Sequence, residues 1–184
     1  MPFQRSSGWT IERLTGTDSG TVLRPVFEEY LTWVAEQLRD NYGIVFDEPD
    51  EVVMERHHRA FDTELPKMLG PRGRVIVARA GEAIVAVGTM KPVTDNIAEI
   101  KRVYVRPDAR GQGIARAIMA RLLDDARTAR FGLVRLETMD FMRQASALYR
   151  SIGAVETVQF DGSEAAAAGV EGFTRYLQIR LAPS

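Results

Sequence analysis

One segment of the sequence, from Val103 to Ala115, constrains the fold more than any other. Its first residues are typical of a β-strand, and Pro107 ends that strand because proline fixes the backbone and lacks an N–H. The pair Gly111 and Gly113 follows, directly before an apolar repeat with helical spacing. A strand that enters a helix through so short a glycine turn predicts a mixed α/β protein. The free amides and the dipole at the start of such a helix favour the binding of an anion.

The hydrophobic pattern of the remaining chain changes from helical to strand periodicity at Val75. Before that point, residues 21–40 form an amphipathic helical pattern in which Pro25 fits only in the first turn. The expected elements are strands at 9–14, 75–78, 83–90, 98–105, 133–138, 155–160 and 173–181, and helices at 21–40, 49–68, 113–130 and 143–151. Residues 161–172 are expected to form either a mobile loop or a short helical turn. This order predicts one mixed α/β domain over residues 1–184.

The composition excludes several classes of protein. Hydrophobic residues make up 45% of the 184 positions and charged residues 27%, which is too apolar for a disordered chain. The chain has no cysteine, and this excludes a disulfide scaffold, a zinc ribbon and a thiol nucleophile. The longest apolar runs are far shorter than the roughly 18 residues that a membrane-spanning helix needs. The first residues do not resemble a secretory signal peptide, so we expect a cytoplasmic protein.

Positive charge is concentrated between residues 101 and 130, which hold eight basic and three acidic residues although the whole chain has a net charge of −1. This asymmetry predicts an anionic ligand near the window. Arg110 and Arg116 flank the two glycines, and we expect them to contact that ligand. The later arginines of the window are expected on a solvated helix face, namely Arg121, Arg127 and Arg130. The glycine loop is therefore predicted to bind a pyrophosphate group.

Two other phosphate-binding loops do not fit the same residues. A P-loop requires Lys and then Ser or Thr after its second glycine, but Ile114 follows Gly113. A dinucleotide-binding fingerprint requires a third glycine at the position of Arg116. A bare glycine pair would also be compatible with a simple strand-to-helix turn, so the flanking residues decide the interpretation.

The flanking residues resemble the acetyl-CoA-binding motif of the GNAT superfamily of N-acetyltransferases. The matching positions are Arg110, Gly113 and Ala115, preceded by Val103, Val105 and Pro107. A second family element, a helix of the form Ala-x-x-Leu-Tyr-x-x-x-Gly, follows at Ala145, Leu148, Tyr149 and Gly153. The sequence departs from the family at Met142, where relatives often carry Asn, and at Ala154, where an aromatic residue is usual. With both motifs in the family order, the chain is similar to this superfamily.

The resemblance implies an α/β (α+β) fold with a mixed, mostly antiparallel central sheet flanked by helices, which is the GNAT acyl-CoA N-acyltransferase fold. It implies acetyl-CoA as the cosubstrate and no metal. The implied activity is transfer of the acetyl group directly to a primary amine of a small molecule or peptide, since a chain without cysteine cannot form an acetyl-cysteine intermediate. The residues implied for cofactor binding are Val103, Tyr104, Val105, Arg110, Gly111, Gln112, Gly113, Ile114, Ala115 and Arg116.

The resemblance also implies three catalytic positions. The amide of Val103 is expected to stabilise the oxyanion that forms at the thioester carbonyl. Glu99 lies four residues earlier on the same face of the strand and is expected to act as the general base. The alternative for Glu99 is a salt bridge to Lys101 or to a surface arginine. Tyr149 is expected to protonate the leaving thiolate, and its alternative is a tyrosine that only packs in the core.

Two other functions stay open from the sequence. A non-catalytic acyl-CoA-sensing module would keep the glycine loop and use Glu99 and Tyr149 structurally. A nucleic-acid-binding domain fits less well, because the chain is not basic overall and lacks aromatic residues between the arginines. We expect a small-molecule or peptide amine as the partner, with no nucleic acid and no membrane, and leave a homodimer open. The adjacent His57 and His58 point in different directions on a helix, so we expect them at the surface or in a substrate pocket rather than at a metal.

Overall fold

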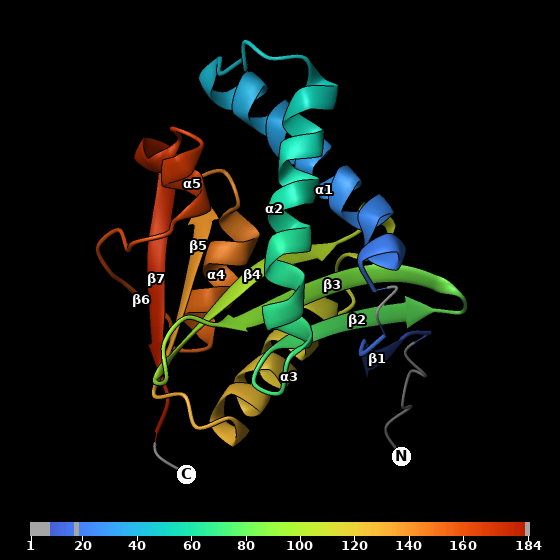
Figure 1. Cartoon of the computed structure of the whole chain (residues 1–184), viewed down its shortest axis with the longest axis vertical. Coiled ribbons are helices and arrows are strands. Elements are labelled where there is room, and N and C mark those ends of the chain that lie inside the picture. The colour runs from blue at the N-terminus through green and yellow to red at the C-terminus, as the bar shows by residue number, and fades with distance from the viewer. Residues whose placement is uncertain (1–7, 17–18, 183–184) are drawn as a thin grey trace.

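The computed structural model describes residues 8–16 and 19–182 and shows a twisted sheet with helices on both faces (Figure 1). The strands are β1 (Thr10–Arg13), β2 (Arg74–Ala80), β3 (Ala83–Pro92), β4 (Ile97–Val105), β5 (Leu133–Met139), β6 (Val155–Glu156) and β7 (Thr174–Arg180). The helices are α1 (Ser19–Tyr42), α2 (Asp50–Leu69), α3 (Ile114–Thr128), α4 (Arg143–Ser151) and α5 (Glu164–Ala167), with short 3-10 turns η1 (Pro107–Ala109) and η2 (Glu171–Phe173). The strand order is β1-β2-β3-β4-β5-β7-β6, and only β4 and β5 run parallel. This confirms the predicted mixed, mostly antiparallel sheet flanked by helices.

Alternate residues of the central strands belong to two separate cores. In β2, Val75 and Val77 pack with α1 and α2, whereas Ile76 and Ala78 pack with α3. Side chains along a strand point to opposite faces in turn, so a strand buried on both sides has a continuous apolar sequence. The run from Val75 to Ala78 meets that condition, which is why the sheet carries a helical layer on each face. No helix in the described ranges is both long enough and apolar enough to span a membrane.

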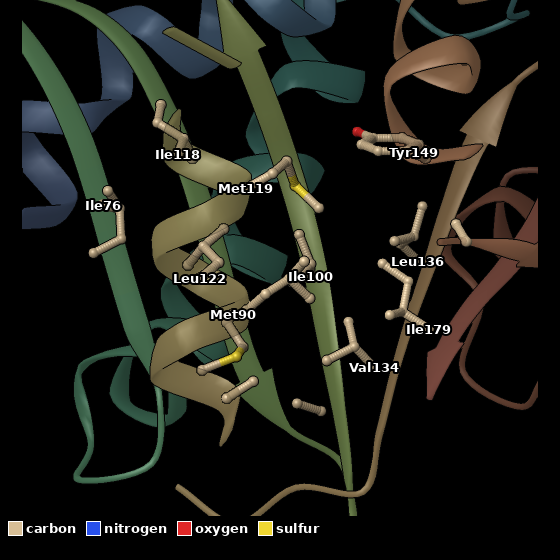
Figure 2. Close-up of a cluster of buried hydrophobic side chains, with 14 of the residues drawn as sticks. Ile76, Met90, Ile100, Ile118, Met119, Leu122, Val134, Leu136, Tyr149 and Ile179 are labelled. Carbon is tan, nitrogen blue, oxygen red and sulfur yellow. The ribbon is translucent and has the colours of Figure 1, made fainter. Parts of the chain in front are cut away.

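Helix α3 contributes a large part of the core on its face of the sheet. Its buried residues recur every three or four positions, at Ile114, Ile118, Met119, Leu122, Leu123 and Ala126. Figure 2 shows this helix against β4, with Ile100 beside it and Tyr149 of α4 in the same layer of side chains. Each fully buried aliphatic side chain stabilises the fold by about 2 kcal/mol. The start of α3, and the glycine loop before it, is therefore held firmly on the sheet.

Strand β4 is irregular where it approaches the glycine loop. Its pairing with β3 shifts register between Lys101 and Tyr104, and Arg102 has a positive φ of 53°. Such a β-bulge bends the strand and aims neighbouring side chains in new directions. On its other edge, β4 pairs with β5 only from Ile97 to Glu99, and beyond that point the two strands separate (Figure 1). The separation leaves an open edge on β4 next to the glycine loop.

The position predicted for Pro25 is wrong. Helix α1 starts at Ser19, two residues before the expected start, so Pro25 lies inside the helix and beyond its first turn. Ser19 Oγ donates to the carbonyl oxygen of Gly16 at 2.6 Å and helps to fix the earlier start. Pro25 cannot donate to the carbonyl of Thr21, and the helix loses this one hydrogen bond without ending.

The chain after α4 differs from the expected long strand over residues 155–160. Only Val155 and Glu156 pair with β7. Farther on, Phe160 lies edge-on to Tyr176 with ring centroids 5.3 Å apart, and the Arg135 guanidinium stacks 4.2 Å from its centroid. These contacts draw the chain over the sheet and end the strand. Residues 161–172 contain α5, so the short helical turn is the alternative that holds.

Candidate active site

The glycine loop leads into α3 as the sequence predicted. After the turn η1, Gly111 and Gly113 have φ angles of 76° and 80°, which are left-handed values that favour glycine. A Cβ at either position would have no neighbour within 4 Å, so backbone conformation and not lack of space requires glycine. Gly113 is the N-cap of α3, and no side chain caps it. The first amides of α3 are therefore available to a ligand.

Two arginines lie beside these amides. Arg110 Nε donates to the carbonyl oxygen of Val105 at 3.0 Å, and its guanidinium lies 5.4 Å from the ring centroid of Trp33. Arg116, in the first turn of α3, donates to Ser151 Oγ of α4 at 2.9 Å. Within the described part of the chain, neither guanidinium has a carboxylate at salt-bridge distance. Their positive charge therefore stays available to an anion.

A cavity of about 520 Å³ lies beside the glycine loop, between β4, α1 and α4. Its walls include nine of the ten residues predicted to bind a cofactor, namely Val103, Tyr104, Val105, Arg110, Gly111, Gly113, Ile114, Ala115 and Arg116. The tenth, Gln112, is exposed and lies outside the walls. We call this space the loop cavity. The structure thus brings the predicted cofactor residues to one place.

Val103 and Tyr149 line the loop cavity from β4 and α4. Tyr149 is buried, and Figure 2 shows its ring pointing from α4 toward β4. Burial raises the pKa of Tyr149 above its ordinary value, and the nearby Tyr30 adds to the effect. The phenol therefore keeps its proton at ordinary pH, and in this state it can act as a proton donor.

Glu99 lies at the last paired position between β4 and β5, in the interior of the sheet. One carboxylate oxygen accepts hydrogen bonds from Arg135, at 3.1 Å from Nε and 2.8 Å from the terminal nitrogen. The other oxygen lies 3.5 Å from Lys101 Nζ. The side chain is almost completely buried and does not line the loop cavity. These surroundings correspond to the salt-bridge alternative, and the role of Glu99 as a base stays a prediction.

A second cavity of about 320 Å³ lies between α1, α2, the end of β5 and α5, and we call it the helix cavity. It shares two wall residues, Tyr30 and Met142, with the loop cavity. Arg102 lines the helix cavity while the next residue, Val103, lines the loop cavity. Successive side chains of a strand point to opposite faces, and this alternation accounts for the change of direction. The two cavities therefore meet at the bulge.

His57 and His58 both line the helix cavity, as the substrate-pocket alternative expected. His58 Nδ1 lies 3.1 Å from a guanidinium nitrogen of Arg24, and its Nε2 lies 3.3 Å from a Glu28 oxygen. Across residues 8–16 and 19–182, no group of three or more His, Cys, Asp or Glu side chains is arranged to hold a metal ion.

An ion network beside the helix cavity could not be anticipated from the sequence. Lys101 donates to Glu64 at 3.1 Å and to Glu164 at 2.7 Å, and Arg102 donates to the same two carboxylates at 3.1 and 2.6 Å. Burial alone would raise the pKa of Glu64, but the cations of Lys91, Lys101 and Arg102 outweigh it and lower the pKa to about 2. Two charges of the basic window are thus neutralised inside the fold and do not face an external anion.

Glu137 of β5 is a partly buried carboxylate that the sequence analysis missed. It accepts hydrogen bonds from Ser163 Oγ at 2.7 Å and from the amides of Glu164 and Ala165 at 3.1 and 3.4 Å. Burial raises its pKa, and the bond from Ser163 partly opposes this. The sequence did contain a signal for this site. Arg135 and Glu137 are two residues apart in a mostly apolar strand, so both charged side chains must face the same side of the sheet.

Known proteins are similar to this chain in sequence or in fold. The IAA acetyltransferase of Azospirillum brasilense is 35% identical over 91 residues, which cover 49% of this chain and 60% of that protein. The match therefore spans less than two thirds of the relative's length. An acetyltransferase structure from Streptococcus agalactiae has a TM-score of 0.67 at 17% identity, covering 95% of this chain and 99% of that one. The structure of yncA from Salmonella typhimurium with its cofactor acetyl-CoA has a TM-score of 0.62 at 16% identity, over 96% of each chain.

A comparison with protein families extends over both sequence motifs. Residues 29–154, well over half of the chain, match the acetyltransferase (GNAT) family. This segment contains the bulge in β4, the glycine loop and Tyr149 of α4. The chain therefore belongs to the acetyltransferase (GNAT) family.

Proposed function

We propose that residues 1–184 form one domain of an acetyl-CoA-dependent N-acetyltransferase, which transfers the acetyl group directly to a primary amine of a small molecule or peptide. The observation that carries the proposal is the meeting of the loop cavity and the helix cavity at the bulge in β4. A ligand in each cavity would have its reacting end at that point. Family membership and the acetyltransferase names of the relatives support this activity.

The chemistry of the loop cavity fits acetyl-CoA. The free amides at the start of α3 suit a pyrophosphate, and Arg110 and Arg116 add the charges that neutralise it. The open edge of β4 from Val103 to Val105 offers backbone groups to the amides of the pantetheine arm. A protein of the same fold, yncA, is described with acetyl-CoA as its cofactor, which supports the same ligand here. The proposal includes no metal.

In the proposed reaction, the lone pair of the acceptor nitrogen attacks the thioester carbonyl carbon, and a C–N bond forms as the carbonyl oxygen becomes an oxyanion. The amide of Val103 donates a hydrogen bond to that oxygen and stabilises its charge. As the C–S bond breaks, Tyr149 donates its proton to the thiolate, and the ammonium proton leaves to a base or to water. Because burial raises the pKa of Tyr149, the phenol is protonated at ordinary pH, as a proton donor must be. An N-acetyl amine and CoA are released.

Glu99 or water receives the proton of the amine in this proposal. Arg135 already occupies one carboxylate oxygen of Glu99, so only the other oxygen could accept that proton. Water that enters from either cavity is the alternative recipient. The proposal assigns the protein to the cytoplasm, without a nucleic acid or membrane partner, and leaves a homodimer open.

A thiol-release assay tests the proposed activity. Acetyl-CoA is incubated with the protein and with amino acids, polyamines, aminoglycosides and short peptides, and each product is identified by mass. We expect release with at least one primary amine, accompanied by an acetylated product. Acetyl-CoA binding by calorimetry without release for any amine would instead support the non-catalytic acyl-CoA-sensing module.

A further inference from the structure

The walls of the helix cavity are mostly apolar. They come from α1, α2, the end of β5 and the α5 segment, and they include the rings of Phe27, Phe46 and Phe61 and the side chains of Val53 and Met54. A space of about 320 Å³ is at the small end of ligand sites, and it suits one ring or a short alkyl chain. The cavity therefore favours a small apolar body over a large polar one.

Most of the charged groups that line the helix cavity already have partners within the protein. Arg102 is held between Glu64 at 3.1 Å and Glu164 at 2.6 Å. Arg24 pairs with Asp62 at 3.2 Å. Glu137, a partly buried carboxylate of the wall, accepts hydrogen bonds from Ser163 and two backbone amides. A charged substrate group would have to break one of these pairs, which costs more than the new pair returns.

Three charged wall residues, Glu36, Arg39 and Asp62, are exposed and lie where solvent screens them. His57 adds little charge to the interior, because burial lowers the pKa of its imidazole. The charge of Glu164 opposes that shift, while those of Arg102, Arg56 and His58 reinforce it.

The helix cavity also reaches the place where the thioester would lie. Tyr30 and Met142 belong to both cavities, and Arg102 directly precedes Val103 on the bulge. An amine whose body fills the helix cavity can therefore direct its nitrogen toward the carbonyl carbon. Apolar walls also disfavour the ammonium form of that nitrogen, and only the neutral form carries the attacking lone pair.

We infer that the helix cavity selects a primary amine carried on a small uncharged apolar body and rejects diamines and free amino acids. The inference rests on the proposed N-acetyltransferase function. A second ammonium or a carboxylate on the substrate would be buried among apolar side chains, beside Arg102, which is already paired with Glu164, and Glu137, whose carboxylate already accepts three hydrogen bonds.

Two matched pairs of amines test the inference through kcat/KM for thiol release. Pentylamine and 1,4-diaminobutane have the same length and differ by a methyl group in place of an ammonium. The second pair, 2-phenylethylamine and phenylalanine, differs by a carboxylate. We expect kcat/KM to be about tenfold or more higher for pentylamine and 2-phenylethylamine, the members without a second charged group. Equal efficiencies, or a preference for the charged member, would overturn the inference while the proposed function stands.

A pair of neighbouring variants on α2 locates the selection in the cavity. Val53 lines the cavity, whereas Val52 does not and is 48% exposed. Val53→Asp places a carboxylate in the wall and should lower the preference for pentylamine over 1,4-diaminobutane by about tenfold, with acetyl-CoA affinity unchanged. Val52→Asp makes the same chemical change outside the cavity and should leave the preference unchanged. An unchanged preference in the folded Val53→Asp protein would contradict the assignment.

Calorimetry separates failure of this inference from failure of the proposed function. The protein saturated with CoA is titrated with each of the four amines, and thermal melts check that both variants fold. Selective binding of pentylamine and 2-phenylethylamine without thiol release would refute the acetyltransferase proposal and support the selective amine site. Equal affinity for 1,4-diaminobutane and phenylalanine would refute the selective site. If Val53→Asp does not fold, Met54→Glu on the same wall is expected to show the same loss of preference.

Discussion

The loop cavity and the helix cavity differ in how the chain builds them. The loop cavity is made largely by one continuous segment, from Val103 to Arg116, with α1 and α4 completing it. The helix cavity is assembled from α1, α2, Arg102, the end of β5 and the α5 segment, which are far apart in the sequence. Among the described residues, the loop cavity has free amides and arginines without carboxylate partners, whereas Arg24 and Arg102 of the helix cavity are paired with carboxylates. A continuous segment can thus present hydrogen-bond donors and charges without partners to a ligand. A cavity assembled from distant segments can instead pair its charges and enclose a space of defined shape.

Among these variants, Gly113→Asp should weaken ligand binding in the loop cavity most severely. The residue has a φ of 80°, which an L side chain adopts with strain, and the new carboxylate would stand at the start of α3 where the pyrophosphate is proposed to bind. We expect acetyl-CoA affinity, measured by calorimetry, to fall on the order of 1000-fold.

Gly81→Asp is the matched control for this change. Gly81 also has a positive φ, 57°, and no neighbour within 4 Å of an added Cβ, but it lies in the β2–β3 turn and lines neither cavity. The control should bind acetyl-CoA normally. Normal binding by a folded Gly113→Asp protein would remove the glycine loop from the proposed site.

Glu99→Gln tests whether the buried carboxylate of Glu99, which lines neither cavity, has a structural or a catalytic role. The substitution leaves Arg135 and Lys101 without their buried carboxylate, so we expect the free energy of unfolding to fall by about 3 kcal/mol in chemical denaturation. Glu12→Gln, which affects the partly exposed pair with Arg79, should cost less than about 1 kcal/mol.

The same Glu99→Gln protein separates the two roles by its turnover. With a strongly basic acceptor amine, a general base would be revealed by a large fall in kcat and a flattened acidic limb of the pH profile. Unchanged kcat and an unchanged acidic limb would reject Glu99 as the base, whatever the loss of stability. The salt-bridge alternative would then account for the residue.

Tyr149→Phe removes the phenol hydroxyl from the loop cavity and keeps the shape of the cavity, so it separates the chemical role of the residue from its packing role. If Tyr149 protonates the thiolate, kcat should fall by about 100-fold while acetyl-CoA affinity is kept. Because burial raises the pKa of the phenol, the wild type should lose no activity to its ionisation below pH 10. Tyr42→Phe, which lies outside both cavities, is the control. A Tyr149→Phe enzyme with normal kcat would make this tyrosine a packing residue.

Arg116→Ala should have the smallest effect. The side chain is exposed, so its charge is partly screened, and we expect CoA affinity to fall by roughly tenfold. Pantetheine, which lacks the pyrophosphate, should lose little. Arg121→Ala removes an arginine of the same helix that is paired with Asp125 at 3.0 Å, and it should change neither affinity. Equal losses for CoA and pantetheine in Arg116→Ala would assign Arg116 to the surface and not to the ligand.

Long periodic segments were the most predictable part of this fold. The apolar repeat from Ile114 to Ala126 and the continuous run from Val75 to Ala78 each specify an element and its buried faces, because periodicity records burial directly. Pro25 was misplaced because the helix starts at Ser19, two residues earlier than expected, where the Ser19 hydroxyl donates to the carbonyl oxygen of Gly16. The strand at Val155 ends early because contacts of Phe160 with distant residues draw the chain away.

By itself, the sequence determined the mixed sheet, the glycine loop and the residues of the loop cavity, since these depend on neighbours within about a dozen positions. Only the tertiary structure decided what surrounds Glu99, how Glu64 and Glu164 neutralise Arg102, and which walls enclose the helix cavity. Backbone conformation and hydrophobic periodicity are local properties. The partner of a buried charge and the shape of a cavity depend instead on which distant segments the packed cores bring together.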